Sequence, residues 1–134
     1  MKNDRKNIIL QALAGLLEER NLSKITTSLL AEKSKITEAA LYRHFPSKRA
    51  IYAELFSFCD DAIFNKCGEL KKSKLAPKEK VKNAFLFFMI FIEKNKGFAR
   101  LLSREALSSD EQNVTDSVNQ FFERFELSIK QMLS

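Results

Sequence analysis

The sequence predicts an all-α protein, and three observations lead to this fold class. Only three glycines and two prolines occur in 134 residues, so the residues that form tight turns between strands are scarce. Leu, Ala, Lys and Glu, which favour helices, are abundant. Apolar residues recur at the three- and four-residue spacing of a helix face. With 45% hydrophobic and 30% charged residues, the chain can form a small head domain joined to a modest helical body.

The sequence contains no signal for export or membrane insertion. Residues 1–6 are rich in charge, and the apolar stretch at 8–17 is short and interrupted. The longest apolar run, at residues 84–92, is far shorter than the roughly 20 residues that span a bilayer. Cys59 and Cys67 lie on one expected helix, about 12 Å apart, which is too far for a disulfide. We therefore expect a soluble cytoplasmic protein with reduced cysteines.

Positive charge is concentrated at the N-terminal end. Residues 1–50 hold ten Lys and Arg against five Asp and Glu, whereas residues 97–134 hold four against six. The whole chain has a formal net charge of +6. An excess of this kind favours a polyanionic partner such as nucleic acid, although it does not identify one.

The first third of the chain predicts a helix-turn-helix. A helix is expected over residues 5–20. Two short helices follow, over residues 28–33 after a Thr26-Thr27 cap and over residues 38–45 after a Thr37 cap. Only about four residues separate them, and a short helix, a tight turn and a second short helix make up the helix-turn-helix plan.

Four further helices are expected in the remainder of the chain. Ser47 caps a long helix that is apolar on two faces, so we expect it to be clamped between the head and the body. The next helix begins at Pro77, with residues 84–92 as its buried centre, and the last is opened by a capping box from Ser109 to Gln112. The expected bounds are 48–70, 77–97, 98–107 and 111–132. The domains are accordingly a DNA-binding head at 1–47 and a helical partner or regulatory domain at 48–134.

The third helix has the composition of a recognition helix. Its inward side chains, with those of the preceding turn, would close the core of the head; these are Leu30, Ile36, Leu41 and Phe45. Small residues at its start would let the backbone approach base edges in the major groove. Tyr42, His44 and Lys48 would contact phosphates, which set register and supply salt-dependent affinity. The expected DNA-binding residues are Thr26, Thr27, Thr37, Glu38, Ala39, Ala40, Tyr42, Arg43, His44 and Lys48.

The run from Leu41 to Lys48, Leu-Tyr-Arg-His-Phe-Pro-Ser-Lys, resembles the recognition-helix signature of the TetR family. The Thr26-Thr27 pair is similar to the family pattern as well. The resemblance implies a TetR-like three-helix head with a short helical C-terminal body, and double-stranded DNA as the partner.

A longer match extends this resemblance to the branch of the family that acts in nucleoid occlusion. It covers the run from Glu38 to Lys48, the opening Ile9 to Ala14, and the late stretch from Asn119 to Glu126. It implies a nucleoid-associated protein that, when bound to DNA, inhibits assembly of the tubulin-like division protein FtsZ. The FtsZ C-terminal tail would bind between the fourth and fifth helices, in a groove formed by Phe58, Lys66, Phe87, Lys94 and Asn95. Lys66 and Lys94 keep the charge where that branch has arginine, whereas Phe87 differs from it.

Two departures from the family pattern affect the expectations. Lys35 occupies a turn position where the family usually has glycine, so the turn is either reshaped or strained by about 1 kcal/mol. The resemblance also implies dimerisation through two further helices, which are absent from these 134 residues. A homodimer is therefore expected, with either a truncated C-terminal domain or a different dimer surface.

The sequence also allows other interpretations of the function and of single residues. No phosphate-binding glycine loop, metal-ligand cluster or nucleophile-base pair points to an enzyme or a cofactor, and His44 is the only histidine. Tyr42 and His44 could merely pack and cap their helix, and Phe58 could be a core residue. The protein could instead be a TetR-type repressor that encloses a small apolar ligand, or an interaction protein that has lost DNA binding.

Overall fold

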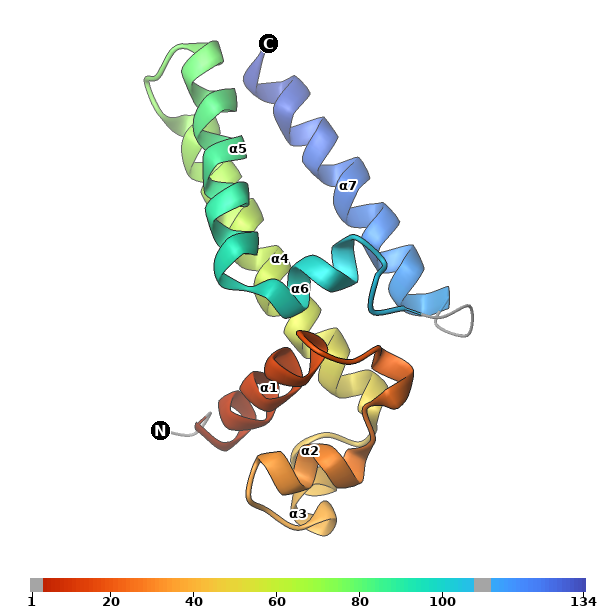
Figure 1. Cartoon of the computed structure of the whole chain (residues 1–134). Coiled ribbons are helices and arrows are strands. Elements are labelled where there is room, and N and C mark those ends of the chain that lie inside the picture. Colours follow the sequence, from red (N-terminus) through yellow and green to blue (C-terminus); the bar gives the residue numbers. More distant parts are fainter. Residues whose placement is uncertain (1–3, 108–111) are drawn as a thin grey trace.

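The computed structural model describes residues 4–107 and 112–134, which form helices joined by turns and loops, without strands (Figure 1). The elements are α1 (Asp4–Leu17), the 3-10 turn η1 (Leu22–Lys24), α2 (Thr27–Lys33), α3 (Glu38–His44), α4 (Lys48–Lys72), α5 (Pro77–Lys94), α6 (Lys96–Leu102) and α7 (Gln112–Met132). The predicted all-α class is therefore confirmed. None of the helices in these residues is long and apolar enough to cross a membrane.

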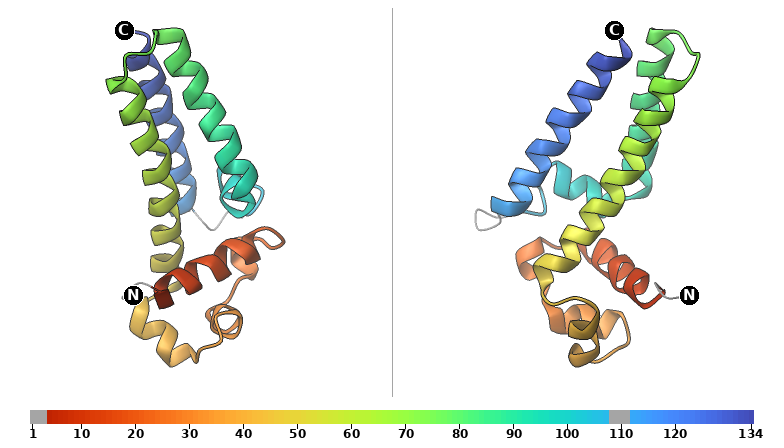
Figure 2. Two further views of the ribbon diagram at one scale, coloured as in Figure 1. Left: turned by 90° about the vertical axis from the view of Figure 1, so that its left-hand side faces the viewer. Right: turned by 180° about the vertical axis from the view of Figure 1, so that it is seen from behind.

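The head and the body are joined by α4. Helices α1, α2 and α3 gather around the first turns of α4, and α5 and α7 flank its remaining length (Figures 1 and 2). The short α6 runs across the lower end of α5, next to α1 (Figure 1). The division into domains at residues 47 and 48 stays a prediction, because one continuous cluster of buried apolar side chains extends through both parts.

Three predicted caps determine where helices begin. The hydroxyl oxygen of Thr26 accepts a hydrogen bond from the backbone N–H of Leu29 at 3.0 Å. Thr37 and Ser47 do the same for α3 and α4, at 3.1 Å each. Each hydroxyl satisfies one of the N–H groups that a helix leaves unpaired in its first turn. These starts could be predicted because the cap and its partner are only three residues apart.

Several helix ends differ from the predictions. Helix α1 stops at Leu17, where residues 18–20 form a turn and η1 follows; η1 was not predicted. Helix α6 ends at Leu102, earlier than the predicted residue 107. The Ser109 capping box lies outside the described residues.

Gly97 lies within α6 and does not terminate α5, which ends at Lys94. A Cβ atom at Gly97 would clash with the carbonyl oxygen of Ala14 in α1. The glycine is therefore required by the close approach of two helices and not by a C-cap. Because Ala14 is 83 positions away in the sequence, the local pattern could not show this role.

Phe121 lies at the centre of the body. Its ring is 1% exposed and packs against rings from α4, α5 and α6, including Phe56, Phe88 and Phe98, with centroid separations from 5.9 to 6.4 Å. Near it, Arg124 of α7 donates a 2.8 Å hydrogen bond to Asp60 of α4. Aromatic packing with one ion pair thus attaches α7 to the rest of the body.

The prediction that residues 84–92 form the buried centre of α5 is wrong for most of them. Only Ala84 is buried. Phe85, Leu86, Met89 and Ile90 are between 46% and 58% exposed. The reason is that α4, α6 and α7 contact α5 from one side, and none of the described helices covers the other.

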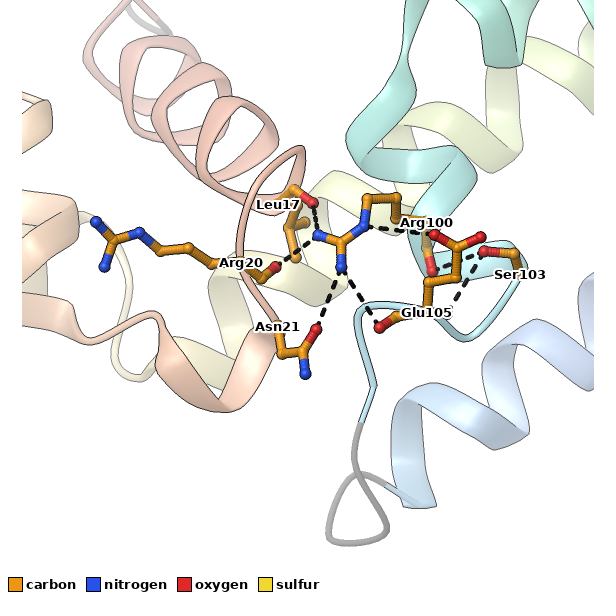
Figure 3. A network of polar contacts seen from close by, with 6 residues as sticks. All are labelled: Leu17, Arg20, Asn21, Arg100, Ser103 and Glu105. Carbon is orange, nitrogen blue, oxygen red and sulfur yellow. Dashed lines mark hydrogen bonds and ion pairs between the residues drawn. The ribbon is translucent and has the colours of Figure 1, made fainter.

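Arg100 of α6 connects the body to the end of α1 (Figure 3). Its guanidinium donates hydrogen bonds to the carbonyl oxygens of Leu17 and Arg20, the latter at 2.9 Å, and to the side-chain oxygen of Asn21 at 3.2 Å. The Leu22 N–H also donates to the carbonyl of Ala106 at 2.7 Å. The body therefore supplies hydrogen-bond partners for the backbone at the end of α1, which orients the head relative to the body.

Candidate DNA interface and candidate peptide groove

The turn between α2 and α3 keeps the geometry of a helix-turn-helix although it contains a lysine. Lys35 has a φ of 59°, the left-handed conformation that favours glycine. Its N–H donates to the carbonyl of Glu32 at 3.1 Å, and the N–H of Ile36 donates to that of Ala31 at 3.0 Å. These two bonds form a complete Schellman motif. Two outcomes were expected for Lys35, a reshaped turn or a strained one, and the structure shows the strained turn.

The outward face of α3 presents most of the predicted recognition residues. Thr37, Glu38, Ala39, Tyr42 and Arg43 are exposed, and His44 is half-buried. Leu41 and Phe45 face inward and are buried, as predicted. Helix α3 therefore has one face that anchors it in the head and another that is available to a partner.

Polar contacts between α2 and α3 fix the orientation of this face. The Thr27 hydroxyl donates to the carboxylate of Glu38 at 2.9 Å and lies 3.1 Å from the Tyr42 hydroxyl. With its proton given to Glu38, Thr27 accepts from Tyr42. The network places the Tyr42 ring, which is 47% exposed, at the surface of the head. The sequence singled out all three residues, but not their mutual hydrogen bonds.

The threonine caps combine structural and exposed roles. Thr26 and Thr37 are exposed, and their oxygens accept hydrogen bonds from the backbone. A hydroxyl that accepts still has one proton to donate. Each cap can therefore hold its helix and donate to a phosphate oxygen at the same time.

Two of the predicted DNA-contact residues, Ala40 and Lys48, make contacts within the protein instead. Ala40 is buried, 8% exposed, so its methyl group packs within the head and does not face outward. The Lys48 ammonium donates to the carbonyl oxygens of Leu22 and Ile25, both at 2.9 Å. Lys48 therefore joins the start of α4 to η1, and the predicted phosphate contact is not the arrangement that the structure shows.

A shallow groove lies between α4 and α5. It has a volume of about 240 Å³ and is lined by Lys66, Asn83, Leu86, Phe87 and Ile90. The Lys66 ammonium is 5.9 Å from the centre of the Phe87 ring and 3.8 Å from a carboxylate oxygen of Glu69. An apolar floor beside a cation suits a peptide that carries apolar and acidic side chains.

The other three predicted groove residues, Phe58, Lys94 and Asn95, do not line this groove. Phe58 is 65% exposed on α4, eight residues or about two turns before Lys66. Lys94 is exposed, and the Asn95 side chain donates to the carbonyl of Phe91 at 2.8 Å. The sequence analysis missed Asn83, Leu86 and Ile90. These residues follow one another at intervals of three and four, the spacing of one helix face, but the prediction placed Leu86 in the buried centre of α5.

Both cysteines are free and buried. Burial, with a smaller contribution from the charge of Asp60, raises the pKa of Cys59 to about 12. Burial also raises the pKa of the Cys67 thiol. Because the thiolate is the reactive form, both side chains act as small apolar groups in the core.

Comparison with known proteins establishes the class that this geometry suggests. The sequence model described as "Bacterial regulatory proteins, tetR family" matches residues 9–55, which span most of α1 through the first turns of α4. A TetR-family transcriptional regulator from Streptomyces coelicolor has the same fold, with a TM-score of 0.64 at 18% identity, over 95% of this chain and 58% of that chain. The chain belongs to the TetR family, whose members bind DNA through a helix-turn-helix.

Within that family, the chain is similar to proteins named nucleoid occlusion factor SlmA. The protein of that name from Vibrio atlanticus is 37% identical over 133 residues, which are 98% of this chain and 68% of the relative. Those from Marinobacter nauticus and Vibrio cholerae are each 36% identical, with the same coverage.

Proposed function

We propose that the protein is a nucleoid occlusion factor: it binds chromosomal DNA through α2 and α3 and inhibits FtsZ assembly through the groove between α4 and α5. The outward face of α3 supports this proposal most directly. Four exposed residues of that face lie within one short helix, and its exposed cap Thr37 precedes them; the capping hydroxyls and the contacts of Thr27 hold the helix in place. Similarity to SlmA proteins supports the division role.

The chemistry of α3 suits the major groove of DNA. Ala39 leaves room for close approach and can contact a thymine methyl group, and Glu38 can accept from the amino group of cytosine. Arg43 and Tyr42 are exposed and can reach guanine or phosphate. We assign base contacts to the start of α3, and phosphate contacts to Thr26, Thr37, Tyr42 and His44.

Binding to a labelled DNA duplex at several salt concentrations tests the head. Arg43→Ala is expected to weaken binding, by about 1–3 kcal/mol if Arg43 contacts a base. If Arg43 contacts phosphate, the salt slope, which is the slope of the logarithm of the binding constant against the logarithm of the salt concentration, falls in magnitude by about one. Lys130→Ala is the matched control, because it removes the same charge from an exposed position on α7. Equal effects of both substitutions would remove α3 from the interface.

Binding of an FtsZ C-terminal tail peptide, followed by fluorescence anisotropy, tests the groove. Phe58→Ala is expected to abolish binding and to leave DNA binding unchanged, because the ring is 65% exposed and contributes little to the core. Phe122→Ala is the control, since that ring is also exposed, at 42%, but lies on α7. Equal loss of both activities would make Phe58 structural.

A chromosome-wide map of binding sites distinguishes nucleoid occlusion from ordinary repression. Many dispersed sites, absent around the replication terminus, are expected. One or two promoter peaks would identify a repressor instead, and no peaks would leave an interaction protein without DNA binding.

One observation favours a ligand-responsive repressor as the second candidate. A partly enclosed pocket of about 160 Å³ lies between α4, α6 and α7, and Tyr52, Phe56 and Leu101 line it beside Arg49 and Asn113. Its volume is below the roughly 300 Å³ at which most ligand sites begin. Occlusion therefore remains our proposal for this protein.

A further inference from the structure

Lys35 has a strained backbone in the turn between α2 and α3. Its φ of 59° lies in the left-handed region, where a Cβ atom crowds the following carbonyl oxygen and which only glycine adopts routinely. Arg104 is the other non-glycine residue with a positive φ in the described part of the chain, and its guanidinium donates a hydrogen bond to Asn119 of α7. The strained residue that follows α6 therefore makes a contact within the protein.

The side chain of Lys35 makes no such contact. It is exposed, and no hydrogen bond, ion pair or ring contact involves it among residues 4–107 and 112–134. The carboxylate of Glu38, three positions further on, accepts from Thr27 instead. The two hydrogen bonds that close the turn come from backbone N–H groups, which a glycine would supply equally well. Nothing that the lysine does within the chain offsets its strain, and strain of this kind is concentrated at functional sites.

The turn lies where the chain passes from one half of the helix-turn-helix to the other. In this motif, the first helix crosses the DNA backbone and the second enters the major groove with its first residues. Lys35 lies between α2 and α3, two residues before the Thr37 cap of α3. Once α3 is in the groove, a side chain at this position is close to the phosphates at the edge of the groove.

A lysine in such a place suits a phosphate better than a base. Its ammonium is a compact charge with three donors on a flexible stem, so it can follow a phosphate oxygen without the fixed geometry that base recognition requires. We propose that Lys35 is a phosphate contact of the head, present although it destabilises the turn. The contact adds affinity that depends on salt and not on base sequence, and it rests on the proposed binding of DNA by α2 and α3.

Stability and DNA binding are therefore expected to change in opposite directions at this one residue. Lys35→Gly removes the strain and the charge together. It should raise the midpoint of thermal unfolding by about 2 °C. It should also weaken binding to a labelled duplex roughly fivefold at about 0.1 M salt and lower the magnitude of the salt slope by about one. If Lys35 were only structural, the more stable variant would bind DNA at least as well as the wild type.

Two further substitutions separate the charge from the strain. Lys35→Arg keeps both, so the salt slope and the unfolding midpoint should stay at their wild-type values. Lys35→Asn removes the charge at a residue type that tolerates a positive φ, so it should reproduce the loss of affinity in Lys35→Gly.

Lys74→Gly is the matched control. It makes the same change at an exposed lysine in the turn between α4 and α5, at the end of the body away from the head (Figure 1). The salt slope of this variant should equal that of the wild type.

The outcomes distinguish failure of the contact from failure of the proposed function. A wild-type salt slope in Lys35→Gly, or a reduced one in Lys35→Arg, would overturn the contact and leave DNA binding by the head intact. Equal losses in Lys35→Gly and Lys74→Gly would also overturn it, because they would assign the effect to net charge. A wild-type protein that binds no duplex at any salt concentration would overturn the proposed function and the contact with it.

Discussion

The head and the α5 side of the body differ in the chemistry of the side chains that they expose. In the head, α3 buries Ala40 and Leu41 and presents mainly polar residues outward, with its position fixed by the Thr37 cap and by the Thr27 hydroxyl. In the body, α5 has apolar residues on all sides, and the rings around Phe121 cover only one of them. The head therefore exposes a mainly polar surface, whereas α5 exposes an apolar one. The polar face of the short α3 and the apolar face of the long α5 are therefore candidate surfaces for partners of different chemistry.

The largest expected effect is the loss of the aromatic centre that holds the body. Phe121→Ala removes a ring that is 1% exposed and should lower the free energy of unfolding by roughly 3–5 kcal/mol. Phe122→Ala, next to it but 42% exposed, should cost far less. Urea denaturation followed by circular dichroism measures both. Similar values for the two would mean that the rings around Phe121 do not form the core of the body.

A smaller effect is expected where polar contacts position the head. Lys48→Met keeps the aliphatic stem but leaves the carbonyls of Leu22 and Ile25 without their donor, at a cost of about 1–3 kcal/mol in unfolding free energy. Lys24→Met, at an exposed position, should be neutral. If Lys48 instead contacts phosphate, stability will not change, and the salt slope of DNA binding will fall by about one.

The strained turn should produce a gain in stability. Lys35→Gly relieves a lysine from its φ of 59°, and the flexibility of glycine in the unfolded chain offsets part of that, leaving a gain of about 0.5 kcal/mol. Lys33→Gly, in the last turn of α2, should instead lose about 1 kcal/mol. Thermal unfolding of the two variants distinguishes them by sign. A loss in both would show that Lys35 makes a contact worth more than its strain.

The smallest expected effect concerns the cysteines. Because burial raises the pKa of Cys59 from 9.0 to about 12, the folded state keeps a proton that the unfolded state loses as the pH rises above 9. The contribution of Cys59 to stability is therefore present below pH 9 and declines between pH 9 and 12. Thiol labelling at pH 8 should be slow in the native protein and fast in urea. Rapid native labelling would place Cys59 near the surface.

Local signals explain how much of the head could be predicted. The caps Thr26, Thr37 and Ser47 act on N–H groups three residues away, so they were visible in the sequence. The inward positions of Leu41 and Phe45 followed from helical periodicity. Ala40 was misassigned because it lies at the edge of the inward face, where periodicity alone does not separate a buried side chain from an exposed one.

The sequence by itself determined the all-α class, the starts of most helices, the recognition-helix signature and its resemblance to the TetR family. Only the tertiary structure decided the roles of Lys48 and Arg100, because each donates hydrogen bonds to groups between 23 and 83 positions away in the chain. It also decided that Gly97 permits close packing, and that α5 is covered on one side. The physical reason is one of range: capping and periodicity act over three or four residues, whereas burial and long side-chain contacts depend on which helices meet.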